Sequence, residues 1–279
     1  RDIGPWSLGI VGLINRGRYD SGEIFYSYDP AGALASTFTQ DVDSESGESI
    51  LRASLSRALG RHRFEFGVEG AFNSLDQALL LTNDNGGGPA VIAIPNSNVL
   101  VEEKRAEAFV VHSWRPDERW AIETRLAGEQ STLTFTGDTD QVVELAFFKP
   151  SVQVSRSFGE RNQARLRVYR DVGQLDFGDF VSAAGISDGL IDGGNPDLRP
   201  QTTWRAELGG DLRFPGDAAL NFTLTRHWIQ DVADLVKLTD DRGTADPSDD
   251  VSFDAPGNIG EADAWSLETQ LTLPLRALL

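Results

Sequence analysis

The side chains that could carry nucleophilic or metal chemistry are few and scattered along the sequence. There is no Cys, and the 3 His residues are His62, His112 and His227. Thiolate chemistry is therefore excluded, and no H-x-x-x-H spacing is present to place two imidazoles on one metal ion. Residues 185–189 fit G-x-S-x-G around Ser187, but a nucleophile elbow needs a buried strand before it and a helix after it. Both flanks are rich in Gly and Asp. We expect no enzyme, metal or cofactor, and an esterase using Ser187 is the alternative left open.

Two polar stretches resemble ion or phosphate loops but lack the residues that such sites need. Residues 240–250 carry several carboxylates without the EF-hand order or its terminal Glu. Residues 86–88 are three glycines with no following Lys-Ser/Thr. We interpret both as solvated surface loops.

The charge balance excludes a further class of function. The chain has 279 residues, with 43 acidic and 25 basic side chains and a formal charge of −18. Nucleic-acid binding needs Lys and Arg clustered on one face, so this balance argues against it. The longest apolar runs, at residues 78–81 and 90–94, are far shorter than the roughly 18 residues of a membrane-spanning helix.

The elements that must position any site are strands, because hydrophobicity alternates with a period of two. Trp204, Ala206, Leu208 and Leu212 alternate with polar positions, and residues 63–72, 120–129, 220–225 and 265–273 behave in the same way. We count about eleven strands of roughly 9 to 18 residues, longer than the usual strand. The fold class is all-β.

Connections of two kinds alternate along the chain. Tight turns are predicted near residues 60–61, 115–118, 159–162 and 215–217, and longer loops at 30–48, 82–98, 172–200 and 239–261, with a shorter connection at 137–140 in the same phase. This alternation is typical of an antiparallel up-and-down meander that forms a partial transmembrane β-barrel. Aromatic and charged residues at predicted strand ends agree with a bilayer on the apolar side. They are Trp120, Trp204, Trp228, Trp265, Arg57, Arg156 and Arg170.

Two ordered motifs carry a family resemblance. The first is Asn195-Pro196-Asp197-Leu198-Arg199-Pro200, and the second contains Asn258, Gly260 and Ala262. Together they resemble the N-P-x-L-[KR]-P-E and N-x-G-x-A motifs of TonB-dependent outer-membrane receptors, with Gln201 in place of the usual Glu. Because proline lacks an N–H donor, we expect the first motif to act as a rigid start of the strand that follows.

The resemblance implies a bacterial outer-membrane location in a Gram-negative cell and uptake of a scarce ligand such as a ferric siderophore, cobalamin or an oligosaccharide. It also implies that residues 1–279 are one barrel segment, truncated at both ends, of a barrel with roughly 22 strands. The implied partners are outer-membrane lipid, the receptor's own plug domain, TonB acting through that plug, and the ligand. The alternatives left open are a passive porin-type channel and a secreted β-sandwich that binds glycans as an adhesin.

The candidate site residues are polar positions on predicted loops and on the polar side of predicted strands. For plug or lumen contacts we expect Arg125, Arg165, Arg167, Arg205, Glu207 and Glu268. For ligand contacts in the loops we expect Asn83, Asp84, Asn85, Asp188, Asp192, Asn195, Asp240, Asp241, Asp249 and Asp250.

Overall fold

The computed structural model describes residues 2–185, 190–240 and 251–274, and strands dominate them. Two short 3-10 helices interrupt the strands, η1 (Phe177–Phe180) and η2 (Pro215–Asp217). The strands, in chain order, are β1 (Asp2–Ile3), β2 (Trp6–Tyr28), β3 (Leu34–Leu59), β4 (His62–Asp84), β5 (Ala90–Ile92), β6 (Asn98–Trp114), β7 (Trp120–Gly137), β8 (Gln141–Phe158), β9 (Asn162–Val172), β10 (Ala183–Gly185), β11 (Leu190–Asp192), β12 (Thr202–Arg213), β13 (Ala219–Gln230), β14 (Ala233–Asp240), β15 (Val251–Asn258) and β16 (Ala262–Thr272).

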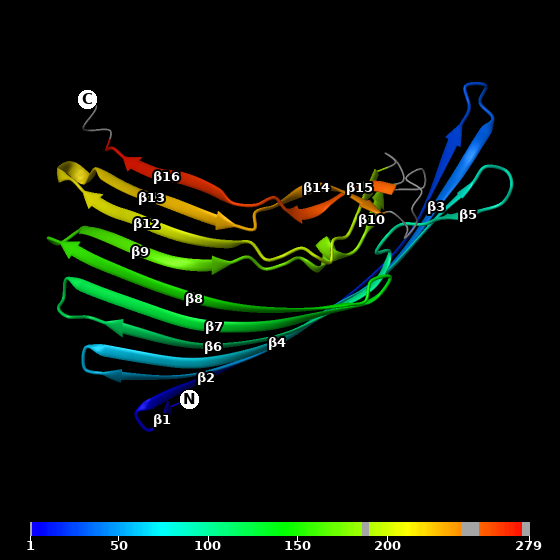
Figure 1. Ribbon diagram of the computed structural model, residues 1–279. Coiled ribbons are helices and arrows are strands. Elements are labelled where there is room, and N and C mark those ends of the chain that lie inside the picture. Colours follow the sequence, from blue (N-terminus) through cyan, green and yellow to red (C-terminus); the bar gives the residue numbers. More distant parts are fainter. Residues whose placement is uncertain (1, 186–189, 241–250, 275–279) are drawn as a thin grey trace.

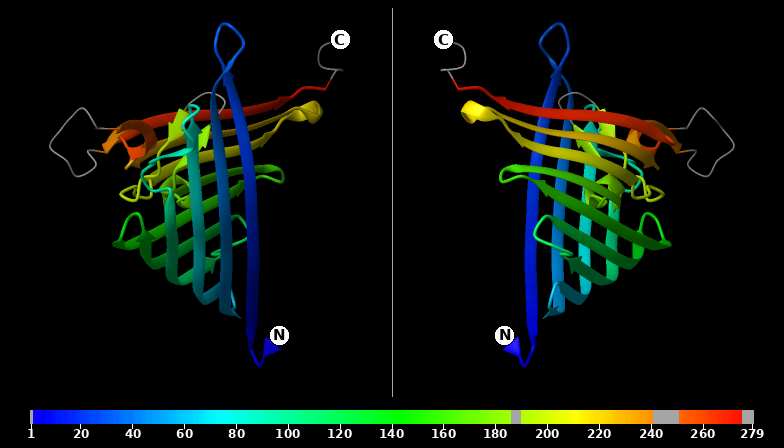
Figure 2. Two further views of the ribbon diagram at one scale, coloured as in Figure 1. Left: turned by 90° about the vertical axis from the view of Figure 1, so that its right-hand side faces the viewer. Right: turned by 90° about the vertical axis from the view of Figure 1, so that its left-hand side faces the viewer.

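Most strands form one antiparallel meander. Its order is β1-β2-β3-β4-β6-β7-β8-β9-β12-β13-β16, with β5 paired to β4 at the side. The sheet curves but stays open, with β2 and the short β1 along one edge and β16 along the other (Figures 1 and 2). The predicted all-β meander, with the architecture of a partial barrel, is confirmed. A second, four-stranded sheet, β10-β11-β15-β14, lies at the end where the long connections are (Figure 1).

The register gives the main sheet two chemically different faces. Glu69 lies opposite Arg52 on β3 and Glu107 on β6, whereas Val68 lies opposite Ala53 and Ala108. We call the face that carries Glu69 the inner face and the other the outer face. Period-two alternation in the sequence therefore becomes a separation of polar from apolar side chains across much of the sheet.

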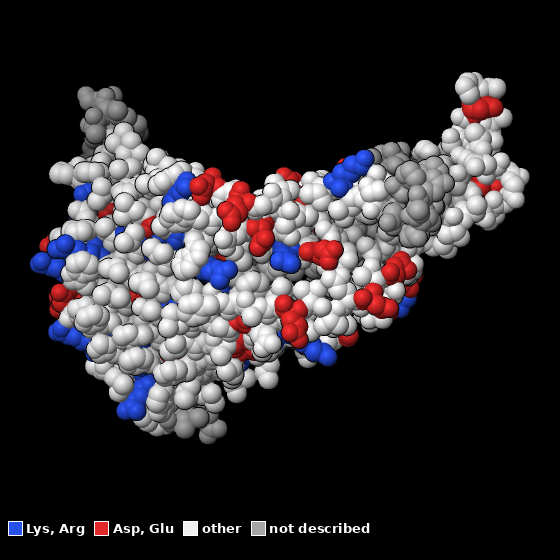
Figure 3. All heavy atoms as spheres, viewed as in Figure 1, with Lys and Arg blue, Asp and Glu red and all other residues white. Residues whose placement is uncertain are grey.

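The apolar outer face is exposed along much of its length. Ile10, Leu51, Val68 and Trp265 are 65, 62, 58 and 65 % exposed. A β-sandwich would bury such residues between two layers, so that alternative is wrong for the described part of the chain. In the view of Figure 3, a mostly uncharged area lies between Lys and Arg at the turn end and a mixture of acidic and basic side chains nearer the loop end. None of the helices among the described residues is long and apolar enough to span a membrane.

Arginines on the outer face pair with aromatic rings near strand ends. The Arg57 guanidinium lies 5.4 Å from the Trp6 ring centroid, and that of Arg156 lies 4.9 Å from Trp120. Near the other end of the strands, Trp204 lies opposite Arg170 and Trp228. Rings and guanidinium groups at both ends suit the two interfaces of a bilayer, where an aliphatic stem can stay in an apolar layer while the charge reaches water.

Several predicted boundaries are wrong in the N-terminal third. Residues 30–48 were expected to form a long loop, but only 29–33 connect β2 and β3, which have 23 and 26 residues. The reason is that this stretch is polar on both faces, so it lacks the alternation that marks a half-buried strand. Further along the chain, β15 lies within residues 239–261, which were expected to be loop, and β14 overlaps that stretch only at its last two residues. The turns at 60–61, 115–118, 159–162 and 215–217 are found where they were predicted.

Candidate ligand site and inner wall

Charged side chains form a ladder across the middle of the inner face. Lys149 on β8 contacts both Glu107 and Glu129, with a Nζ–Oε2 distance of 2.7 Å to Glu129. Arg125 pairs with the same Glu107. Three neighbouring strands, β6, β7 and β8, thus share two cations between carboxylates that are only 12 % (Glu107) and 10 % (Glu129) exposed. These contacts hold the charges close to the wall.

The ladder continues toward the β2 edge. Arg105 and Arg52 both approach Glu69, at 3.5 and 4.0 Å. The Phe109 ring lies between the guanidinium groups of Arg52 and Arg125, which are 4.5 and 4.3 Å from its centroid. Stacking of this kind restrains an arginine without neutralising it. Stacking on Phe109 therefore fixes the positions of the Arg52 and Arg125 charges on the inner face.

A second group of inner-face charges lies on β9 and β12. Arg205 pairs with Asp171 at 3.1 Å, and Tyr169 donates its hydroxyl hydrogen to Glu207 at 2.7 Å. The Arg167 guanidinium lies 4.0 Å from the Tyr169 ring centroid. The register brings all six predicted lumen residues to the inner face, and Arg165 and Glu268 line one shallow pocket there.

Removal of the shared cation is expected to destabilise the wall. In Lys149→Met, Glu107 keeps Arg125 but Glu129 loses its partner while remaining mostly buried. We expect a loss of about 2 kcal/mol in the free energy of unfolding, between the values for exposed and buried ion pairs. Urea unfolding of the protein in detergent measures this loss. The matched control is Arg18→Met, whose partners Asp43 and Glu45 are more than half exposed, and equal losses in both variants would contradict the prediction.

In the connection between β9 and β12, the described residues 173–185 and 190–201 fold back onto the inner face. The connection's side chains Phe180, Val181 and Leu198 pack against Val101 and Phe135 of the wall. Phe135 and Phe180 meet edge to face, with ring centroids 5.1 Å apart. Where the connection packs on the wall, the inner face is therefore apolar, which differs from the expected polar lining. The wall residues buried in this contact are Val99, Val101, Leu133 and Phe135.

Hydrogen bonds fix the connection in this position. Ser182 donates its hydroxyl hydrogen to the Pro95 carbonyl and accepts from the Gly194 N–H. Asn96 donates from Nδ2 to the Gly194 carbonyl at 3.0 Å, and Gln77 donates from Nε2 to the Ser182 carbonyl at 2.8 Å. Gly194 is required here because a Cβ would lie 2.2 Å from the Phe180 carbonyl oxygen. The inward position is thus set by close backbone contact.

The two sequence motifs contact each other. Asn258 accepts from the Arg199 N–H through Oδ1 at 2.8 Å and donates from Nδ2 to the Arg199 carbonyl at 3.0 Å. The same Nδ2 donates to the Asp231 carbonyl at 2.8 Å. Asn195 donates to the Pro256 carbonyl at 2.8 Å. Arg199 lies between Pro196 and Pro200 and is not part of a strand. The Asn258 side-chain amide therefore supplies the two backbone hydrogen bonds that a neighbouring strand would otherwise make with Arg199.

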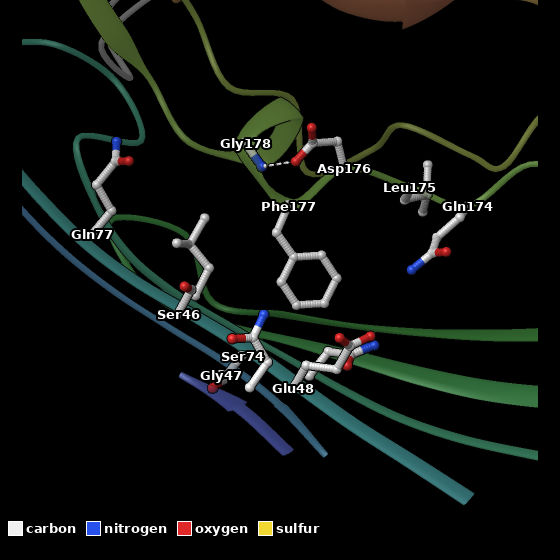
Figure 4. A pocket seen from close by; sticks show the side chains of 13 residues that line it. Ser46, Gly47, Glu48, Ser74, Gln77, Gln174, Leu175, Asp176, Phe177 and Gly178 are labelled. Carbon is white, nitrogen blue, oxygen red and sulfur yellow. Dashed lines mark hydrogen bonds between the residues drawn. The ribbon is translucent and has the colours of Figure 1, made fainter. Parts of the chain in front are cut away.

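A pocket of 640 Å³ lies between the connection and the inner face of β2, β3 and β4. Figure 4 shows the Phe177 ring pointing from η1 toward these strands, and Asp176 accepting from the Gly178 N–H at the helix start. The wall contributes mostly hydroxyl and amide groups. The lining includes Asn15, Ser46, Glu48, Asn73, Gln77, Gln174, Leu175, Asp176 and Phe177.

One buried acceptor in this pocket has no partner. Asn73 is 8 % exposed, and its Nδ2 donates to Glu103 at 2.8 Å, which fixes the amide orientation. Its Oδ1 then has no hydrogen bond. Nearby on η1, burial raises the pKa of the Asp179 carboxyl above its usual range, and the adjacent Asp176 carboxylate raises this pKa further. The pocket thus combines unused hydrogen-bonding capacity with acidic neighbours.

The predicted loop residues have different environments. Asp84 ends β4 and accepts from the Gly86 and Gly88 N–H groups, and Asn195 holds the motif contact described above. Both side chains thus bond to backbone groups, which are local for Asp84 and distant in sequence for Asn195. The Asn83 Oδ1 has no partner, and Asp192 lies opposite Ala183 and Asp254. Asn85 follows β4, and Asp240 ends β14. Outside the described residues lie Ser187, Asp188, Asp241, Asp249 and Asp250.

The pocket residues were not predicted from the sequence. Asn15, Ser46 and Asn73 are ordinary polar positions on strands, and nothing local distinguishes them from other inner-face residues. Phe177 lies in a stretch that was read only as loop. The usable signal was the loss of alternation at Leu79, Leu80 and Leu81, because apolar residues on both faces of a strand indicate that something covers the inner one.

Comparisons with known proteins agree on one architecture. The model of the Outer membrane protein beta-barrel family matches residues 8–278. Comparison with curated proteins gives no match. Similar solved structures include the ferric-catecholate import receptor Fiu from K12 E. coli, with 10 % identity and a TM-score of 0.62 over 96 % of this chain. The copper transporter OprC has 12 % identity and a TM-score of 0.63 over 95 %.

A third similar structure is FpvA of P. aeruginosa bound to heterologous pyoverdines, with 14 % identity and a TM-score of 0.60 over 99 % of this chain. The chain spans 42, 40 and 37 % of these three solved chains, in the order given. At such identities the likeness shows a shared fold. The first of these proteins is named as an import receptor and the second as a transporter.

Proposed function

The chain belongs to the Outer membrane protein beta-barrel family, and from this membership we propose that it forms part of the barrel of a TonB-dependent receptor. The receptor takes up a scarce ligand such as a ferric siderophore, cobalamin or an oligosaccharide. The chain's location is the outer membrane, and its outer face contacts lipid. The long connections face the outside of the cell, and the turns face the periplasm.

The observation that carries this proposal is the inner face itself. The barrel wall combines a ladder of restrained, paired charges with a connection that folds inward above it. A plug domain held inside the barrel would meet a patterned surface of both signs, and Arg–carboxylate contacts are well suited to such recognition. Arg125, Arg165, Arg167, Arg205, Glu207 and Glu268 are proposed to contact the plug or the passing ligand.

The proposed sequence of events begins with ligand capture between the long connections. The pocket beneath residues 173–201 holds the ligand while TonB, acting through the plug, opens the path along the inner wall. The paired charges keep the wall hydrated during passage. Because the ladder cations Lys149, Arg125, Arg105 and Arg52 each lie near a carboxylate, this part of the wall binds a passing solute weakly and lets it leave.

The test separates energised uptake from passive diffusion. The complete gene is expressed in cells, and ligand uptake is measured with and without TonB and with and without a protonophore. Loss of either TonB or the proton gradient is expected to abolish uptake while surface binding persists. An uptake rate that is unchanged by loss of TonB and by the protonophore, together with steady conductance in planar bilayers, would instead identify a passive porin-type channel.

A further inference from the structure

The pocket beneath the inward connection carries unused polar groups of a particular kind. In the described part of the chain, the exposed side chains of Asn15, Ser46 and Gln174 line it without a hydrogen bond to another protein group, so they are open to a ligand. The Oδ1 of Asn73 is a buried acceptor in the same state. A buried acceptor without a partner is costly, and its orientation is fixed by Glu103, so it is ready to accept a hydrogen from a bound molecule.

The charge of the pocket excludes one class of ligand. Its charged lining residues are Glu48 and Asp176, and no Lys or Arg among the described residues lines it. Anionic ligands are usually bound by arginine or lysine. The inner-face cations closest along the register, Arg52 and Arg105, both pair with Glu69. A negatively charged iron complex would therefore meet only uncompensated carboxylates here.

The remaining groups match a neutral, hydroxyl-rich molecule. Hydroxyl and amide side chains both donate and accept hydrogen bonds, as sugar hydroxyls do. The Phe177 ring and Leu175 provide an apolar surface on the side of the connection, against which the C–H face of a sugar ring can lie (Figure 4). The volume of 640 Å³ falls within the range of about 300–1,000 Å³ that is usual for ligand pockets.

The position of the pocket suits capture from outside. On β4 the outer-face residues change from apolar to polar after Phe72, where Ser74 and Asp76 follow. Asn73 and Gln77 lie at this same height on the inner face. The pocket thus sits at the loop-side limit of the apolar band, where a ligand that enters between the connections arrives before it reaches the ion-pair ladder.

We propose that this pocket binds a neutral oligosaccharide and that it sets the receptor's ligand class. This inference rests on the proposed function. Asn15, Ser46, Asn73 and Gln174 bind sugar hydroxyls, Glu48 and Asp176 accept further hydroxyl hydrogens and repel anions, and Phe177 supports one ring.

The experiment is isothermal titration calorimetry on the protein expressed from its complete gene and purified in detergent. The probes are neutral trisaccharides of glucose, xylose or galactose, and the anionic iron(III) complex of a tris-catecholate. At least one trisaccharide is expected to bind and the iron complex is not. Ser46→Ala is expected to weaken trisaccharide binding about fivefold, and the double variant Asn15→Ala/Ser46→Ala about thirtyfold, since each removes roughly one hydrogen bond.

The control variant is Ser54→Ala, an inner-face serine of the same strand that does not line the pocket, and its affinity should equal that of the wild type. Binding of the iron complex alone, binding of no trisaccharide, or trisaccharide binding that Asn15→Ala/Ser46→Ala leaves unchanged would each overturn the inference. Energised uptake of an anionic ligand would overturn the ligand class and leave the receptor function standing. Passive conductance without TonB dependence would overturn the receptor function itself.

Discussion

Gly194→Ala is expected to release the inward connection from the wall. The added Cβ would lie 2.2 Å from the Phe180 carbonyl oxygen and 2.5 Å from the Val181 nitrogen, and neither backbone atom can rotate away. The shift would also disturb the hydrogen bonds that Gly194 makes with Ser182 and Asn96. Overpacking together with two weakened hydrogen bonds corresponds to about 3–5 kcal/mol of local stability.

Native-state proteolysis measures this effect, because cleavage of a locally opening segment follows its opening free energy. A loss of about 3 kcal/mol raises cleavage within residues 173–201 by roughly a hundredfold, while the barrel strands stay protected. The matched control is Gly70→Ala, whose Cβ would meet nothing within 4 Å. Equal cleavage rates in the two variants would show that the connection is not held by this contact.

Asn258→Ala is expected to weaken barrel folding strongly. The side chain makes three hydrogen bonds, to both backbone groups of Arg199 and to the Asp231 carbonyl. Pro196 and Pro200 flank this segment and have no N–H groups to offer in their place. Removal of the amide leaves backbone groups without partners at the starts of two strands, at a cost of about 3 kcal/mol.

The measurement is the folded fraction of the protein on semi-native gels and its urea midpoint in detergent. Asn98→Ala is the control, since Asn98 also begins a strand but its side chain donates only to the Ser97 hydroxyl, so its loss should stay below about 1 kcal/mol. Asn258→Asp keeps the acceptor and loses both donors, and should resemble Asn258→Ala. An Asn258→Asp protein as stable as the wild type would mean that the donated bonds contribute little.

The strands and their two faces could be predicted because one chemical rule governs them. Where one face meets an apolar phase and the other water, as around Val68 and Glu69, alternation is unambiguous. Near Thr37 and Asp84 this alternation is lost: the ends of β3 and β4 are mostly polar on both faces, and the end of β2 carries Ile24, Phe25 and Tyr26 in succession. The rule does not apply there, and the strand ends could not be located from the sequence.

The candidate site depends on contacts between residues that are far apart in the sequence. Local sequence patterns do not predict such contacts. The apolar floor under the connection combines Val101 and Phe135, whose alignment depends on a register that the sequence does not state. The prolines of the first motif predicted a rigid strand start, but the partner Asn258 lies 59 positions away from Arg199. The pocket residues become neighbours only after both of these arrangements exist.

The hairpin of β2 and β3 reaches past the start of β6, and its turn is closed by Asp29, which accepts from the Ala31 and Ala33 N–H groups. Ala31 is exposed at this tip, and the chain contains no cysteine. A cysteine placed at position 31 would therefore be the single thiol in this chain, carried on a stiff support far from the pocket. A spectroscopic probe attached there would report how the neighbouring connections move, with no competing label on the wall.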